Sequence, residues 1–204
     1  MDSAIIHLKF ISSIHMTAPD ILNGRLHSGH FVCIRDHQRI GDVEILDRLG
    51  ISEYQRLTDK KPNGPYVVLF DAGTWTVIAD SWYYNLWHSP QTRLAIDALA
   101  RAYDLYVCSV GDCDLSYSIE YHENGTLRRK HVVDSPGLND QIVTADFGEP
   151  LHAEVGIWKR DIDDYFRIQL LGESLGIPLI VSDSQLRIYC IDREDETESP
   201  DFLA

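Results

Sequence analysis

The sequence predicts an α+β fold, a single domain with a mainly antiparallel sheet built from hairpins and two main helices packed on it. The strongest sign is Asn124-Gly125 between two alternating segments, because this dipeptide favours a two-residue hairpin turn. Two apolar runs on either side of residues 71–73 indicate a second hairpin. The helical patterns interrupt the strands and do not alternate with them, which argues against a doubly wound parallel fold.

The first quarter of the chain predicts short elements. Residues 4–11 and 30–34 are expected to be strands, and the stretch between them, 17–29, is rich in loop-forming residues. Residues 42–49 predict a short helix, because a glycine stop signal follows directly. A second short helix is expected to begin at Ser52.

Residues 66–70 and 74–79 are apolar runs rich in β-forming residues, and they predict a hairpin. Its turn is expected at Asp71-Ala72-Gly73, and the stretch 60–65 ahead of it predicts a loop.

A helix is expected over residues 90–102, since Ser89 suits the N-cap and Pro90 the first helical position. The face expected to pack on the sheet follows helical spacing: Leu94, Ala95, Ala98, Leu99, Ala102 and Tyr103. Arg93, Asp97 and Arg101 fall on the opposite side.

A strand at 103–109 precedes the hairpin formed by 115–122 and 126–133. A two-residue turn pairs Glu123 with Thr126, and this register places Glu120 opposite Arg129 as a favourable charge pair. The same register places Ser118 opposite His131 and Tyr117 opposite Val132. It also puts Tyr117, Ile119 and Tyr121 on one face with Arg128 and Lys130.

The last third predicts a loop-like region at 134–156, with a short strand at 142–145. A second main helix is expected over 161–175 because acids suit its N-terminal end and Gly176 suits the position after its C-terminus. Its expected apolar face is Ile162, Tyr165, Phe166, Leu170 and Leu171. Closing strands are expected at 179–181 and 185–191. The domain is expected to span 1–191, and the acidic tail 192–204 to be disordered.

The chain is acidic, with a net charge of -14. Residues 1–100 carry 11 acids and 9 bases, whereas residues 101–204 carry 21 acids and 9 bases, so the excess lies in the second half. This balance argues against a nucleic-acid binder, which needs clustered Lys and Arg. An acidic surface either keeps the protein soluble or meets a basic partner.

Little in the sequence favours a metal, a cofactor or a catalytic frame. Cys108 and Cys113 are separated by four intervening residues with no second pair, and zinc sites need two more ligands. Cys108 is expected to be a buried core residue. Asp112 and Asp114 either form a solvated turn, contact a partner or hold Mg²⁺ or Ca²⁺, but the rest of a calcium loop is absent from the sequence. The nine histidines match no catalytic motif.

The densest aromatic segment contains Trp82, Tyr83, Tyr84 and Trp87. Such rings either pack in a core or anchor a partner. The N-terminus lacks the features of a signal peptide, and no apolar stretch reaches the length of a membrane span. The four sparse cysteines fit a reducing compartment, so a cytoplasmic location is expected.

Residues 82–178 resemble small, mostly uncharacterised bacterial proteins of the toxin-immunity type. The resemblance rests on the aromatic segment and the helix after it, on CSVGDCDLSYSIEYHENGTLRRKHVV, on FGEPLHAE and on a late helix ending in LGIP. Several proteins of this kind are encoded near polymorphic toxins. The resemblance implies toxin binding, and it carries over no catalytic residue.

The sequence therefore predicts a non-catalytic, cytoplasmic immunity protein that neutralises a cognate bacterial toxin, possessing no cofactor or metal and binding neither nucleic acid nor membrane. The partner is expected to be a basic toxin domain, since opposite charge steers association. The expected contact residues are Trp82, Tyr83, Tyr84, Trp87, Asp112 and Asp114. Two alternatives stay open: a structural or regulatory protein-interaction domain, and an unfamiliar metal-dependent hydrolase that uses the two aspartates and a histidine.

Overall fold

A computed structural model describes residues 20–22, 25–27, 30–35, 40–51, 53–57, 66–80, 90–111, 116–137, 140–160, 162, 164–177 and 186–191. The expected elements at 4–11 and 179–181, the loop at 60–65 and the acidic tail lie outside this range.

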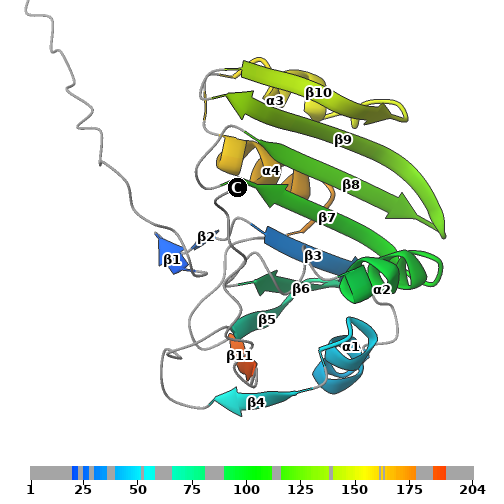
Figure 1. Ribbon diagram of the computed structural model, residues 1–204, viewed down its shortest axis with the longest axis vertical. Helices are drawn as coiled ribbons and strands as arrows, with labels where there is room; N and C mark the ends of the chain where they lie inside the picture. The colour runs from blue at the N-terminus through cyan, green and yellow to red at the C-terminus, as the bar shows by residue number, and fades with distance from the viewer. Residues whose placement is uncertain are drawn as a thin grey trace, which may run out of the picture.

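Nine strands form one antiparallel sheet in the order β10-β9-β8-β7-β3-β6-β5-β11-β4 (Figure 1). Their bounds are β3 His30–Arg35, β4 Tyr54–Leu57, β5 Tyr66–Ala72, β6 Trp75–Asp80, β7 Asp104–Val110, β8 Tyr117–Glu123, β9 Thr126–Gly137, β10 Asp140–Phe147 and β11 Arg187–Ile191. A separate antiparallel pair joins β1 (Asp20–Leu22) to β2 (Arg25–His27). The predicted antiparallel α+β architecture is confirmed, and the sheet dominates it.

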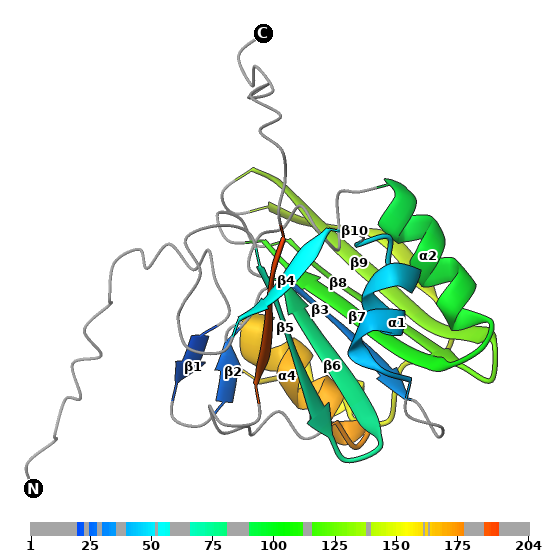
Figure 2. The same ribbon diagram turned by 90° about the horizontal axis from the view of Figure 1, so that it is seen from below.

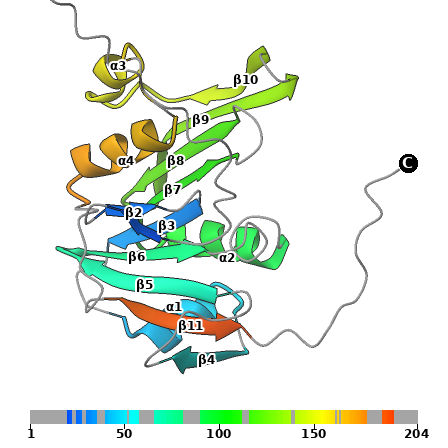
Figure 3. The same ribbon diagram turned by 90° about the vertical axis from the view of Figure 1, so that its left-hand side faces the viewer.

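Helices cover both faces of the sheet, so the described part of the chain has three layers (Figures 2 and 3). Helices α1 (Asp42–Arg48) and α2 (Pro90–Ala100) lie on one face, and α3 (Glu154–Ile157) and α4 (Asp164–Ser174) lie on the other. Successive strand residues point to opposite faces, and both faces of the central strands are buried. This explains why the central strands read as nearly continuous apolar runs.

Two apolar clusters fill the spaces between the layers. The cluster under α1 and α2 contains Val32, Leu69, Ile78, Ile96 and Val107. The cluster under α3 and α4 contains Phe31, Phe70, Val77, Tyr106 and Ile168. The central strands therefore contribute alternate side chains to both cores, and each helix contributes to one.

Several local predictions need correction. Strands β1 and β2 lie in the stretch 17–29, which was expected to be a loop. The short helix expected from Ser52 is wrong, because Tyr54–Leu57 form edge strand β4 and pair with β11. The turn of the β5–β6 hairpin is Gly73-Thr74, since Ala72 pairs with Trp75.

Helix α2 is confirmed, but its expected buried face is only partly right, because Leu99 of that face is buried and Leu94 is not. Leu94 is 70% exposed, whereas Thr92, Ile96, Leu99 and Ala100 are buried. These four positions also follow helical spacing, so the apolar pattern alone does not fix the rotation of the helix about its axis. In α4 the buried positions include Ile168 and Leu171, while Phe166 of the expected face is 40% exposed.

The hairpin of β8 and β9 has the predicted Asn124-Gly125 turn but a different register beyond it. Glu123 pairs with Thr126 and His122 with Leu127, and Tyr121 then pairs with Arg129. Arg128 is therefore an extra residue, a β-bulge. It moves Glu120 opposite Lys130 and brings Arg129, not Arg128, onto the face of Tyr121.

The same shift pairs Ser118 with Val132 and Tyr117 with Val133, each one residue away from the expected partner. The region expected to be loop-like at 134–156 continues β9 and contains the whole of β10 and the short helix α3. The strand expected at 142–145 is part of β10.

Candidate functional site

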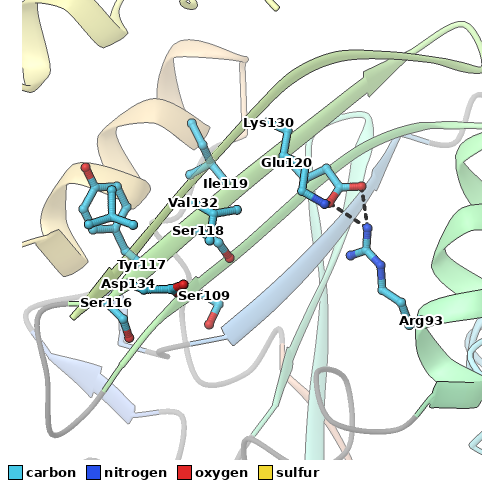
Figure 4. Close-up of a pocket in the computed structure, with 11 residues that line it drawn as sticks. Arg93, Ser109, Ser116, Tyr117, Ser118, Ile119, Glu120, Lys130, Val132 and Asp134 are labelled. Carbon is cyan, nitrogen blue, oxygen red and sulfur yellow. Dashed lines mark hydrogen bonds and ion pairs between the residues drawn. The ribbon is translucent and has the colours of Figure 1, made fainter. Parts of the chain in front are cut away.

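A groove of about 130 Å³ opens on the α2 side of the sheet, over β7, β8 and β9 (Figure 4). It is lined by Arg93, Ser109, Ser116, Tyr117, Ser118, Ile119, Glu120, Lys130, Val132, Val133 and Asp134. Closer to α1 the same face of the sheet is aliphatic. The groove is thus a polar region at the border of an apolar core, and it has two chemically different ends.

The charged end is organised around Glu120. Its carboxylate oxygens both lie 2.7 Å from Nη2 of Arg93 on α2, and Oε1 also lies 2.8 Å from Nε2 of His122. Nζ of Lys130 lies 3.4 Å from Oε2. Lys130 reaches Glu120 because the bulge places the two residues opposite each other.

These contacts determine the charge of Glu120. Burial alone would raise its pKa, but hydrogen bonds from His122 and Arg93, with the charges of Arg93 and Lys130, lower the pKa to about 2. Glu120 is consequently a carboxylate at neutral pH, and its acceptor capacity is largely used within the cluster.

The hydroxyl end lies where Ser109, Ser118 and Asp134 approach one another (Figure 4). Ser109 pairs with Ser118 across β7 and β8, and its Oγ lies 2.9 Å from Nδ1 of His30 on β3. Ser118 Oγ is buried and has no hydrogen-bond partner within the described residues. The Asp134 side chain is exposed and forms no ion pair with the part of the chain that the structure describes.

Strand β10 extends this face to the edge of the sheet. Asp134 pairs with Ile142 and Lys130 with Phe147, and antiparallel partners share one face. Ile142 is 52% exposed and Phe147 is 54% exposed. We call the groove together with Ile142, Ala145 and Phe147 the open face. No described helix covers β9 and β10 on this side (Figure 3).

Behind the open face, a buried ion pair fixes β9, β10 and α3 together. The Nε and Nη2 atoms of Arg129 lie 2.6–3.1 Å from the carboxylate of Glu154, and both side chains are buried. Nη1 of the same guanidinium donates to Asp146 and to the carbonyl oxygens of Phe147 and Gly148. Arg129 thereby connects β9 to the end of β10, to Gly148 and to α3.

Glu154 receives further donors. The indole Nε1–H of Trp158 and the backbone N–H of Leu151 donate to its carboxylate at 3.1 and 2.9 Å. Burial would raise the pKa of Glu154, but these bonds and Arg129 outweigh burial and lower it. Trp158 also packs against Tyr117, with ring centroids 5.1 Å apart. Every strong acceptor in this cluster is engaged, which indicates a structural role.

The sequence-predicted contact residues Trp82, Tyr83, Tyr84, Trp87, Asp112 and Asp114 all lie outside the described residues. The open face was not predicted from the sequence. One signal in the sequence could have indicated it: residues 131–158 contain five acids and no Lys or Arg.

Cys108 is buried, as expected, and so is Cys33, while Cys113 lies outside the described residues. Burial raises the pKa of both buried thiols well above the ordinary value, so both stay protonated at neutral pH. Among the described residues, no three His, Cys, Asp or Glu side chains gather closely enough to hold a metal ion. None of the described helices combines the length and the apolar character needed to cross a membrane.

Comparisons of the chain with protein-family models, with curated proteins and with solved structures gave no significant match.

Proposed function

We propose that this chain is a protein-binding protein of the immunity type, which neutralises a cognate bacterial toxin by covering the toxin's active site with the open face. The observation that carries the proposal is the pair Ile142 and Phe147, two large apolar side chains more than half exposed on an edge strand. Exposed apolar side chains grouped on one face are typical of interaction sites.

The geometry of β10 favours contacts through its side chains over the pairing of a partner strand with its backbone edge. The pairing of β10 with β9 has two register irregularities, between Asp140 and Ile142 and between Val143 and Ala145. Such bulges twist an edge strand and disfavour pairing with another chain. The partner is therefore expected to contact the side chains of β9 and β10 and not the backbone edge.

Charge supports a basic partner. Of the five acids in segment 131–158, Asp146 and Glu154 are paired with Arg129 behind the open face, whereas Asp134 lines the groove, in a protein of net charge -14. Nucleases and other toxins that act on nucleic acid carry basic clefts, and an acidic inhibitor gains fast, steered association with such a cleft. The buried Arg129–Glu154 pair supports this surface from behind.

The experiment uses the product of the gene adjacent to this one, produced as a candidate toxin. Co-expression with the wild-type chain is expected to restore growth, and the purified proteins are expected to bind with an affinity that falls as salt rises. The double variant Ile142→Arg/Phe147→Arg is expected to weaken binding at least tenfold, because two apolar contacts are replaced by charges that repel a basic partner.

Leu94→Arg is the control, since Leu94 is a large apolar residue on α2 that is also more than half exposed. It changes the net charge in the same direction and is expected to keep binding within about twofold. Equal losses in both variants would mean that net charge and not the open face determines binding. Failure of the wild-type chain to bind or protect would reject the immunity role and would favour an interaction domain with a different partner.

A further inference from the structure

Two polar groups of the groove have unused hydrogen-bonding capacity. Ser118 Oγ is buried without a hydrogen-bond partner in the described part of the chain. Asp134 lines the same groove and its carboxylate is engaged by none of the described side chains. A buried polar atom without a partner requires an explanation, and one explanation is a ligand or a partner group that completes the site.

The sheet register brings these two groups to the same end of the groove. Ser118 pairs with Val132, and Asp134 is the next residue of β9 on that face. Diagonal neighbours on one face of an antiparallel pair have Cβ atoms about 7 Å apart, a gap that one polar group can bridge. The hydrogen bond between His30 and Ser109 fixes the Ser109 hydroxyl beside them.

A donor with positive charge satisfies both groups best. Asp134 can only accept hydrogen bonds, and the Ser118 hydroxyl can accept one as well. The cations at the other end, Arg93 and Lys130, already contact Glu120. Lys130 and Asp134 are four residues apart along β9, about 13 Å at the usual rise of a strand, so Lys130 does not neutralise Asp134.

From this geometry we infer that the groove receives an arginine side chain of the basic partner, whose guanidinium pairs with Asp134 and donates to Ser118. The inference rests on the proposed function and names the group that the open face recognises. Arginine fits better than lysine because its planar guanidinium offers five donors and can reach a carboxylate and a neighbouring hydroxyl at once. A groove of about 130 Å³ accommodates such a head group but not a large ligand.

The first experiment uses L-argininamide as the probe and records the amide NMR spectrum of the full chain during titration. The expected shifts concentrate at Ser118, Asp134 and their neighbours on β8 and β9. Asp134→Asn is expected to weaken binding of L-argininamide at least fivefold, and Ser118→Ala is expected to weaken it about twofold to fivefold. Asp47→Asn removes the same charge from an exposed position on α1 and is expected to have no effect.

Lys130→Gln tests whether the groove binds a cation or an anion. Removing a cation from the rim is expected to strengthen L-argininamide binding, and propionate, used as an anionic probe, is expected not to bind. Weaker argininamide binding in Lys130→Gln, or propionate binding that depends on Arg93, would overturn the inference in favour of an anion site. Equal binding to wild type and Asp134→Asn would also overturn it.

The toxin complex separates this inference from the proposed function. If Ile142→Arg/Phe147→Arg abolishes toxin binding and Asp134→Asn leaves it unchanged, the immunity role stands and the arginine inference is wrong. If both variants lose at least tenfold in toxin affinity, the immunity role and the arginine inference are both supported. If the wild-type chain does not bind the toxin, the proposed function fails and a toxin arginine is excluded as the occupant, whereas the argininamide titration still decides the chemistry of the groove.

Discussion

Arg129 and Glu154 form a buried ion pair, with Nη2 of the arginine 2.6 Å from Oε1 of the glutamate and both side chains at most 4% exposed. The two residues are 25 positions apart, and the pair joins β9 to the start of α3. Because Arg129 also binds the carbonyl oxygens of Phe147 and Gly148, this one side chain determines where the chain leaves β10.

Removing either partner is expected to be strongly destabilising. Arg129→Met leaves the Glu154 carboxylate buried without its main donor, and Glu154→Gln leaves the guanidinium with the exposed Asp146 as its remaining charge partner. Each is expected to cost about 3–5 kcal/mol of unfolding free energy, measured by urea denaturation. The double variant Arg129→Met/Glu154→Leu is expected to cost much less than the sum of the single changes, since it leaves no unpaired buried charge.

Arg128→Met is the matched control for this cycle. Arg128 is adjacent in sequence, half-exposed, and paired with Glu123 at 3.3 Å. Exposed ion pairs contribute about 0–1 kcal/mol, so Arg128→Met is expected to lower the unfolding free energy by less than about 1 kcal/mol. A large effect of Arg128→Met, or a small one of Arg129→Met, would contradict the assignment of the buried arginine.

Gly148 is expected to tolerate no side chain. Its φ is +79°, and a Cβ atom built on it would lie 1.9 Å from the carbonyl oxygen of Arg128, the bulge residue. Gly148→Ala is therefore expected to destabilise the fold by about 3 kcal/mol or more, or to prevent folding, since backbone must move. Gly156→Ala in α3 meets nothing within 4 Å and is expected to be neutral or stabilising by up to about 1 kcal/mol. Thermal unfolding of the two variants compares them directly.

The bulge at Arg128 also explains why the sequence misassigned the ion pairs. From the Asn124-Gly125 turn alone, the register places Glu120 opposite Arg129, and one extra residue changes that partner to Lys130. The bulge lies beside distant residues: Glu154 pairs with Arg129, and Gly148 leaves no room for a side chain next to the Arg128 carbonyl. Local sequence signals report turns, but they do not report such long-range contacts.

The two faces of α2 show the same limit. Leu94 and Ile96 are both apolar, and which of them is buried depends on how the sheet contacts the helix. Strands in the centre of the sheet were predictable because both of their faces are buried and their composition is continuously apolar. The open face was not predictable, since Ser118, Asp134 and Ile142 are separated in sequence and become neighbours only through strand pairing.

Asn124 and Gly125 adopt φ values of +51° and +73°, as a two-residue hairpin turn requires. A Cβ on Gly125 would also lie 3.1 Å from the carbonyl oxygen of Arg101. Replacing both residues by alanine is expected to lower the unfolding free energy by about 1 kcal/mol or more. Asn124→Gly alone is expected to cost less, because glycine adopts the same φ without strain. Unchanged melting of the double alanine variant would contradict the turn's role in stability.

Glu120 is expected to make stability depend on pH. Its folded-state pKa of about 2 lies below the ordinary value of 4.5, so its carboxylate stabilises the folded state fully above pH 4.5. This contribution is lost as the pH falls from 4.5 towards 2, and a shift of this size corresponds to roughly 3 kcal/mol. The difference in unfolding free energy between wild type and Glu120→Gln is therefore expected to shrink across that window, as measured by denaturation at a series of pH values.

Glu44→Gln serves as the control, because Glu44 is half-exposed and its pair with Arg48 spans one helical turn. That pair is expected to contribute about 0.3–0.5 kcal/mol, so its variant's difference from wild type should change little with pH. A difference for Glu120→Gln that stays constant down to pH 2 would mean that Arg93, His122 and Lys130 do not stabilise the charged form of Glu120.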